Sequence, residues 1–143
     1  MTDSAPKSVL LVFEDGDVRQ ESIQYSVELV RRTGGELQLL MLVGHDRVGP
    51  ALEQVRQRFS AAVEAACNLG LTPGSELRAG DKASEFLKFL AYAPACSTVV
   101  WGSSEQALLG RRRGRPRHWL GRLGREVSCP IVTPRIRKPT DGG

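Results

Sequence analysis

Five arginines lie close together in the stretch GRRRGRPRHW, at residues 110–119. A guanidinium group binds phosphate or carboxylate through a planar fork of N–H donors, so several of them on one loop can surround an anion. We therefore predict that this stretch binds an anionic ligand or an acidic protein. The candidate anion-binding residues are Arg111, Arg112, Arg113, Arg115 and Arg117.

The net charge of +4 is distributed unevenly along the 143 residues. Residues 1–100 contain 10 Lys or Arg and 13 Asp or Glu, whereas residues 101–143 contain 10 and 3, so the two parts carry −3 and +7. The positive field is therefore local. It favours an anionic partner near the C-terminal third of the chain, such as phosphate, nucleotide, nucleic acid or an acidic protein.

The sequence lacks the residue patterns that usually carry catalysis or bind metal ions. It contains two histidines, His45 and His118, and neither HExxH nor GxxxxGK[ST] occurs. His45 fits a loop, and His118 fits the start of a helix. We therefore expect a protein that is not an enzyme, with no catalytic residues, no metal site and no resident cofactor.

The cysteines and the apolar runs bear on the compartment. Cys67, Cys96 and Cys129 form no CxxC pair, and we expect them to be reduced and mostly buried. No apolar run reaches the roughly eighteen residues of a membrane span, and the first seven residues lack the features of a signal peptide. We expect a cytoplasmic protein without membrane insertion.

Apolar runs alternate along the chain with segments of helical periodicity. The expected strands are residues 8–13, 36–43, 75–79, 97–101 and 130–136. The expected helices are residues 18–33 with Asp17 as cap, residues 51–69, a helix capped by Asp81, and a short helix from Trp119 to Val127. This alternation predicts a single α/β domain over residues 1–143, ordered from about residue 7 to 137. Five parallel strands form its doubly wound sheet, with helices on both faces.

Four short motifs, in this order and spacing, resemble the universal stress protein family. They are Asp15-Gly16 after the first strand, GDKASEFL after the third, VVWGS at the end of the fourth, and SCPIVTP near the end of the chain. The resemblance covers about residues 7–137. It implies the strand order 3-2-1-4-5 and a homodimer formed through the last strand, at about residues 130–136. An unpaired edge strand that bears Val and Ile independently favours coverage by a second chain.

Nucleotide-binding members of the family carry a loop after the fourth strand that reads G-x-x-G, nine residues, then Gly followed by Ser or Thr. Here Gly102 begins the pattern, but Glu105 replaces the second glycine and Arg115-Pro116 stand in place of Gly-Ser. Glu105 adds a negative charge, and Pro116 has no N–H to donate to phosphate. We therefore expect the usual phosphate cradle to be lost.

The front of the nucleotide site is better matched. The resemblance assigns Asp15 to the acidic position after the first strand and Leu42 to the apolar position that meets adenine. Asp15 is equally explained as a turn former and Leu42 as a core residue. The candidate nucleotide-binding residues are Asp15, Leu42, Gly102 and Ser103.

The sequence leaves three functions open. The first is a universal stress protein-like cytoplasmic dimer with a regulatory or protective binding role in stress response, without ordinary ATP binding. The second is adenine-nucleotide binding, of ATP or AMP, with the arginines around the phosphates. The third is association with DNA, because RGRP at residues 113–116 resembles the extended core of an AT-hook, whose arginines enter the minor groove. A solvated charged loop is the simplest alternative to all three.

Overall fold

The computed structural model describes residues 8–92, 96–123 and 126–134, without the side chain of Arg112. Residues 7 and 135–137 of the expected ordered core lie outside this part of the chain, as does the Arg112 side chain that was predicted to bind an anion.

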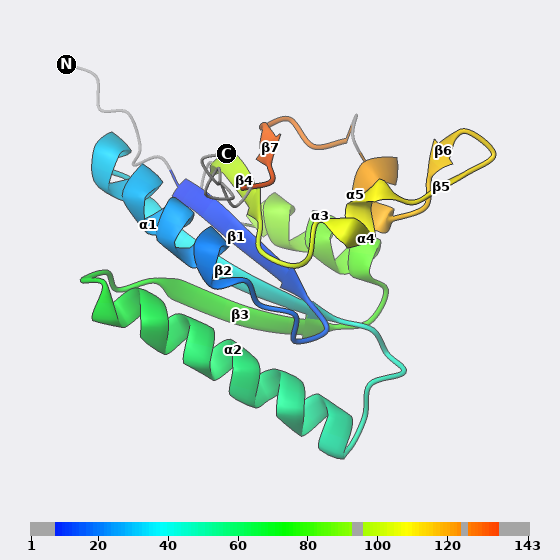
Figure 1. The fold of residues 1–143 in the computed structure, drawn as a ribbon, viewed down its shortest axis with the longest axis horizontal. Helices are drawn as coiled ribbons and strands as arrows, with labels where there is room; N and C mark the ends of the chain where they lie inside the picture. The colour runs from blue at the N-terminus through cyan, green and yellow to red at the C-terminus, as the bar shows by residue number, and fades with distance from the viewer. Residues whose placement is uncertain (1–7, 93–95, 124–125, 135–143) are drawn as a thin grey trace, which may run out of the picture.

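One five-stranded sheet forms the centre of the molecule (Figure 1). All of its strands pair in parallel, in the order β3-β2-β1-β4-β7. They are β1 (Ser8–Glu14), β2 (Glu36–Val43), β3 (Gly74–Ala79), β4 (Cys96–Trp101) and β7 (Ile131–Val132). Since β7 is the fifth strand of this sheet along the chain, the predicted doubly wound topology is confirmed.

The position of each strand in the sheet follows from its apolar content. β1 and β2 are nearly continuous apolar runs, and both are buried on their two faces. β3 and β7 form the two edges and are largely half-buried or exposed. The last strand is shorter than predicted, because Thr133 and Pro134 are not in a strand, and the predicted residues 135 and 136 lie outside the described chain.

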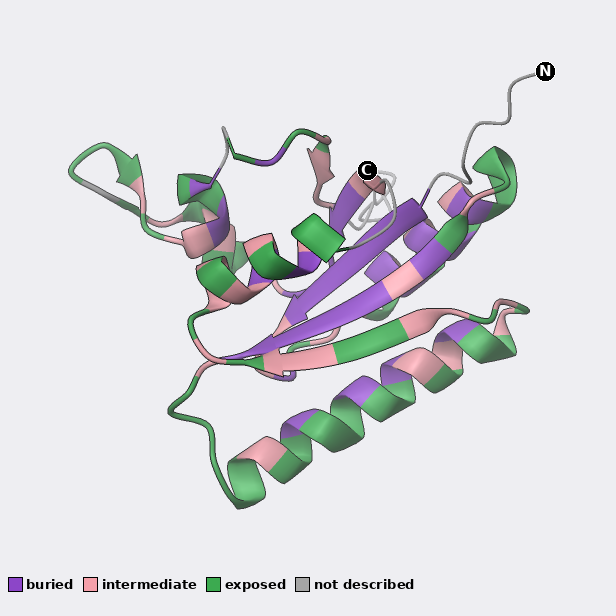
Figure 2. Cartoon of the chain, turned by 180° about the vertical axis from the view of Figure 1, so that it is seen from behind, coloured by how far each residue is buried: buried purple, intermediate pink, exposed green. Residues whose placement is uncertain are grey.

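Helices cover both faces of the sheet, as predicted (Figure 2). Two long helices pack on one face, and α3 and α5 pack with Leu10, Val12, Leu40 and Leu42 on the other. The helices are α1 (Gln20–Thr33), α2 (Pro50–Asn68), α3 (Lys82–Tyr92), α4 (Gln106–Leu109) and α5 (Trp119–Arg122).

Local sequence explains most of the helix ends. α1 ends at Gly34, whose φ of 72° lies in the left-handed region that favours glycine. Asp81 accepts a hydrogen bond from the amide of Ser84 at 3.0 Å, so its predicted capping role is confirmed. The predicted cap by Asp17 is wrong, because Arg19 is the N-cap residue of α1 and the Asp17 carboxylate accepts from the amide of Ser104 at 2.8 Å.

The arginine-rich stretch, which was predicted to be a loop, folds into a short antiparallel hairpin. Its strands are β5 (Arg111–Arg112) and β6 (Arg115–Pro116). Arg113 and Gly114 form the turn with φ values of 53° and 78°, the two positive values that a two-residue hairpin of type I′ requires. The hairpin projects from the body of the protein beside α5 (Figure 1).

Two other expectations concern burial and membranes. Cys67 is exposed and Cys96 and Cys129 are half-buried, so the prediction of mostly buried cysteines is wrong. Cys67 is exposed because it faces outward from α2, away from the core positions Ala62 and Ala66. Among the described residues, no helix is both long and apolar enough to cross a membrane.

Candidate functional site

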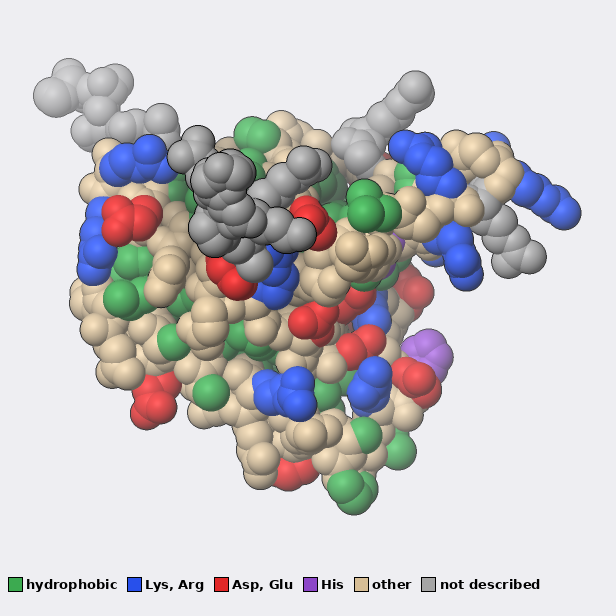
Figure 3. Space-filling model, in the orientation of Figure 1, with side chains coloured by type: hydrophobic (Ala, Val, Ile, Leu, Met, Phe, Trp, Pro, Cys, Tyr) green, Lys and Arg blue, Asp and Glu red, His purple; other side chains and the backbone are tan. Residues whose placement is uncertain are grey.

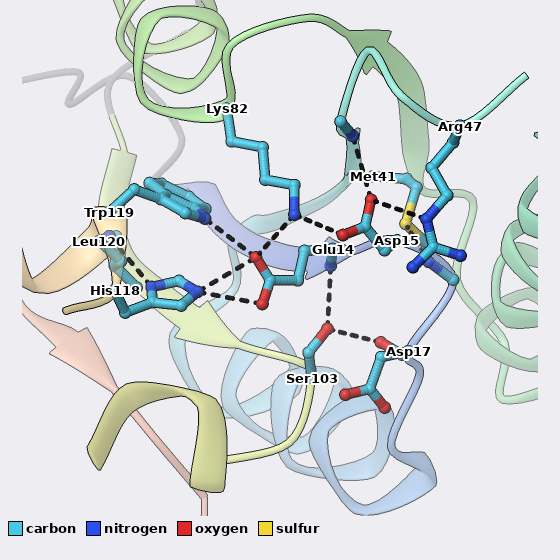
Figure 4. Close-up of polar contacts among 12 residues, drawn as sticks. Glu14, Asp15, Asp17, Met41, Arg47, Lys82, Ser103, His118, Trp119 and Leu120 are labelled. Atoms are coloured by element: carbon cyan, nitrogen blue, oxygen red, sulfur yellow. Dashed lines mark hydrogen bonds and ion pairs between the residues drawn. The ribbon is translucent and has the colours of Figure 1, made fainter. Parts of the chain in front are cut away.

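The carboxyl ends of β1, β2 and β4 meet at one edge of the sheet. Ligands of open α/β sheets bind at this edge, where the order of the strands reverses direction. Here β1 is flanked by β2 on one side and by β4 on the other, so the reversal falls beside β1. The loops that follow these strands, with the start of α3 and the segment before α5, surround this point (Figure 4).

Asp15, predicted from the first loop, connects three segments of the chain. Its Oδ1 accepts a hydrogen bond from the amide of Gly44 at 3.0 Å, and its carboxylate forms an ion pair with Lys82 at the start of α3. Arg47 lies 3.9 Å from the same carboxylate. Burial by itself lowers the pKa of Lys82, but the bonds to Asp15 and the neighbouring Glu14 outweigh burial and raise it. Asp15 therefore ties the loops after β1 and β2 to α3.

The predicted residues of the fourth-strand loop are occupied by internal contacts. The hydroxyl of Ser103 donates to the carbonyl of Asp17 at 2.5 Å and accepts from the amide of Glu14 at 2.9 Å, and Ser103 has no exposed surface. The amide of Gly102 donates to Val12 at 2.7 Å, and its carbonyl accepts from Arg19 at 2.9 Å. The loop after β4 is thus bound to the loop after β1.

Packing explains why position 102 is glycine. A Cβ atom at Gly102 would lie 2.5 Å from Cε1 and 2.6 Å from Cδ1 of Phe13, closer than real Cβ contacts. The glycine is therefore required by its contact with the aromatic ring, whether or not a phosphate ever approaches its backbone.

Leu42 lies in the core. Its exposed fraction is 0 %, and it packs with Phe86 of α3 and Trp101 of β4. It is joined to the candidate site through its backbone, since its carbonyl accepts from the amide of Asp15 at 2.8 Å. The structural explanation given for Leu42 from the sequence therefore holds in this conformation.

Glu14, which the sequence analysis did not select, lies at the centre of the site. Its carboxylate accepts from Nε2 of His118 at 3.0 and 3.1 Å, from Nε1 of Trp119 at 2.9 Å and from Nζ of Lys82 at 3.3 Å (Figure 4). Burial by itself raises the pKa of Glu14. The hydrogen bonds from His118 and Trp119, with electrostatic attraction to Lys82, outweigh burial and lower this pKa to about 2. The Glu14 side chain is therefore a carboxylate anion that is bound by donors of the protein itself.

His118 joins Glu14 to the start of α5. Its Nδ1 accepts from the amide of Leu120 at 3.1 Å, so the hydrogen that is donated to Glu14 is carried by Nε2. The centre of the imidazole ring lies 4.9 Å from the ring centre of Trp101 and 5.1 Å from that of Trp119. Only 8 % of the His118 side chain is exposed. His118 is the N-cap residue of α5, in agreement with its predicted place at a helix start.

The arginines of the hairpin surround a second feature, an open hollow of about 770 Å³. Its lining residues are Arg113, Arg115, Pro116, Arg117 and Arg122. Positively charged side chains gather around the projecting hairpin in the space-filling view (Figure 3). Arg122 of α5, which was not among the predicted residues, thus joins three that were, whereas Arg111 lies 3.5 Å from the carbonyl of Gly114 in its own turn.

A smaller hollow of about 260 Å³ lies over the loops that follow β2 and β3. Its wall includes His45, Lys82, Trp119 and Arg122, together with the carboxylates of Asp46 and Asp81. Arg122 borders both this hollow and the arginine-lined one. The arginine-lined hollow is therefore cationic, whereas the smaller one combines Arg122 and the indole ring of Trp119 with two carboxylates.

The conformation of the RGRP segment differs from the one expected for DNA. Arg113 and Gly114 adopt left-handed backbone angles, and Arg115 and Pro116 pair with Arg112 and Arg111. An AT-hook core is extended through these positions, so this hairpin does not present the predicted minor-groove conformation.

Comparison with known proteins links this geometry to one fold. No family model matches the sequence, and no curated protein sequence matches it. A universal stress protein family member from Burkholderia pseudomallei is 18% identical over 94% of this chain and 100% of that chain, with a TM-score of 0.64. The chain has the universal stress protein fold.

Two further solved structures of this fold contain an adenine nucleotide. The universal stress protein from Archaeoglobus fulgidus, in complex with dAMP, is 15% identical over 90% of this chain and 97% of that chain, with a TM-score of 0.64. A universal stress protein family protein from Arabidopsis thaliana, with AMP bound, is 14% identical over 95% of this chain and 98% of that chain, with a TM-score of 0.56.

Within the universal stress protein fold, the predicted residues separate into two groups. Asp15, Gly102 and Ser103 meet at the carboxyl end of β1 through the loops described above, with Leu42 beneath them in the core. The arginines form a separate group on the hairpin. Glu105 and Pro116 replace residues of the family's phosphate-binding pattern. Glu105 is the residue before α4, and Pro116 lies in β6 of the hairpin.

Proposed function

We propose that this chain is a universal stress protein that works as a regulatory or protective binding protein in the cytoplasm, without catalytic chemistry or an ordinary ATP site. One observation carries the proposal. The hydroxyl of Ser103 and the amide of Gly102, which lie where the family's phosphate-binding pattern begins, form hydrogen bonds within the protein.

The energetic cost of freeing those groups supports this reading. A buried donor or acceptor that loses its partner costs about 1–3 kcal/mol, so exchanging several such bonds for a ligand brings little net gain. Glu14 adds a half-buried negative charge next to the same loop, and this charge would repel a phosphate there. We therefore expect the crevice between the loops after β1 and β4, beside Glu14 and Ser103, to disfavour the triphosphate of ATP.

The arginine hairpin is the surface through which we expect binding to occur. Four guanidinium side chains line its open hollow, and their partner would be an anionic ligand or an acidic protein surface. This assignment retains the predicted anion-binding role of Arg113, Arg115 and Arg117 and adds Arg122.

A homodimer through β7 completes the proposal. β7 is an edge strand, and both Ile131 and Val132 are half-buried. Within the described residues β7 pairs with β4 alone, so its outer edge is open to a second copy. Equilibrium sedimentation at tens of micromolar should give a dimer, and a monomer at that concentration would exclude this interface.

Titration calorimetry with ATP and AMP at moderate salt tests the lost nucleotide site. We expect no micromolar binding to the wild-type protein. Micromolar binding to the wild type would contradict the proposal. If that binding survives the double change Arg113→Ala and Arg115→Ala, the nucleotide is held by the crevice; if it is lost, the nucleotide is held by the arginines.

Adenine-nucleotide binding through the arginines is the second candidate. The arginine-lined hollow and the hollow beside Trp119 share Arg122, and two relatives of the same fold hold AMP or dAMP. In this case Arg113→Ala with Arg115→Ala should abolish micromolar binding. The matched control is Arg31→Ala with Arg32→Ala at the exposed end of α1, which should leave it unchanged.

A further inference from the structure

Two cysteine side chains touch at the start of the sheet's last pair of strands. Cys96 is the first residue of β4, and Cys129 lies two residues before β7. The thiol of Cys129 donates to Sγ of Cys96 at 3.6 Å, and the thiol of Cys96 donates to the carbonyl of Thr98 at 3.3 Å. Both residues are half-buried beside the core that α3 and α5 share.

We propose that Cys96 and Cys129 are an oxidation site at which a hydroperoxide forms a reversible intramolecular disulfide. The two sulfur atoms are in van der Waals contact, and a disulfide bond needs an approach of about 1.5 Å more, within reach of small side-chain rotations. Partial exposure gives a small oxidant access. Cys67 lies on α2, which packs on the opposite face of the sheet, so it serves as an internal control.

Burial and the neighbouring Cys129 raise the pKa of Cys96 to about 12, and we therefore assign the first attack to Cys129. The Cys129 thiolate attacks one oxygen of hydrogen peroxide, the O–O bond breaks, and the hydroxide that leaves is protonated to water. The resulting sulfenic acid on Cys129 is then attacked by the sulfur of Cys96. Cys96 gives up its proton, and the hydroxyl group leaves as a second water. Two thiols lose two electrons and two protons in total, and one peroxide becomes two waters.

The bond would fix the edge of the sheet. β7 pairs with β4 at two register positions, Val99 with Ile131 and Val100 with Val132. The amide of Val99 also donates to Pro130 at 2.9 Å. A covalent link one residue before Pro130 would hold this short strand in register, and it would close a loop that contains the whole arginine hairpin. Oxidation would thereby stabilise the edge strand proposed for dimerisation. Only this effect on the dimer rests on the proposed function; formation of the disulfide does not.

Peroxide treatment of the folded, full-length protein tests the site. After a brief exposure, free thiols are blocked and the protein is digested without reductant for mass spectrometry. We expect a peptide that joins Cys96 to Cys129, a chain lighter by two hydrogen atoms, and Cys67 still free. Dithiothreitol should restore all three thiols, and the oxidised protein should melt several degrees higher than the reduced one. Free Cys96 and Cys129, or linkage through Cys67, would overturn the proposal.

Three serine variants make the test independent of any single substitution. Cys67→Ser should keep the cross-link, while Cys129→Ser should lose it. Cys96→Ser should let sulfenic acid accumulate on Cys129, where dimedone labels it. Labelling of Cys96 in Cys129→Ser, with none of Cys129 in Cys96→Ser, would contradict the assigned order of attack.

Discussion

Replacing Glu14 by glutamine should remove a large, pH-dependent part of the stability of the fold. The carboxylate accepts hydrogen bonds from His118 and Trp119 and faces Lys82, so it joins β1 to α3 and α5. The amide of glutamine carries no charge, and its NH₂ group would face the donors of His118 and Trp119. A variant at position 14 therefore tests whether this internal anion holds the edge of the sheet together.

The magnitude follows from the pKa of Glu14, which falls from 4.5 to about 2 on folding. Such a shift corresponds to about 3 kcal/mol of folding free energy. Because the folded pKa is the lower one, this contribution is fully present above pH 4.5. It disappears as the pH falls through about 2, and roughly 1.5 kcal/mol remains at pH 3.

Urea unfolding at pH 7, 5, 4 and 3, followed by tryptophan fluorescence and circular dichroism, measures the effect. Glu14→Gln should be about 3 kcal/mol less stable than the wild type at pH 7, and the difference should shrink to about half by pH 3. Glu36→Gln, which changes an exposed carboxylate at the amino end of β2, is the control and should show a small difference. A gap for Glu14→Gln that stays the same from pH 7 to pH 3 would refute the reasoning.

Three further substitutions probe the closed loop and the hairpin. Ser103→Ala removes a buried hydroxyl that bonds two backbone partners, so urea unfolding should show a loss of about 2 kcal/mol, while Ser60→Ala on the exposed face of α2 should change little. Gly102→Ala forces a methyl group against the ring of Phe13, and we expect a loss of about 1–3 kcal/mol by the same measurement. Arg113→Asn replaces a residue with φ of 53° by one that tolerates this conformation, so the melting temperature should rise slightly; a fall would speak against the type I′ turn.

The sheet could be predicted because its strands are encoded locally. The run SVLLVF needs no partner to be read as a buried strand, and Gly34 marks the end of α1 by its backbone freedom alone. Such signals require a few neighbouring residues. They gave the order of elements and the two covered faces. The order of the strands in the sheet came from the resemblance to the universal stress protein family.

The site could be predicted only in part, because its contacts join distant segments. Glu14 and His118 lie 104 residues apart in the sequence, and neither belongs to a motif that names the other. The one available signal was an acidic residue directly after a buried strand, and it was shared with Asp15. Asp17 was misassigned for the same reason, since its partner Ser104 lies 87 residues away and competes with the local cap.

The arrangement of charges explains why the hairpin, and not the crevice, is the anion-binding surface that we propose. A crevice that binds phosphate must offer hydrogen-bond donors that are not already paired with a carboxylate of the protein. Here Lys82 faces both Glu14 and Asp15, and the N–H groups of His118 and Trp119 point at Glu14. An incoming phosphate would have to displace the Glu14 carboxylate from these donors. With a pKa of about 2, this carboxylate stays negatively charged at neutral pH and competes with the phosphate. The guanidinium groups around the open hollow are exposed, so binding an anion there breaks none of these internal bonds.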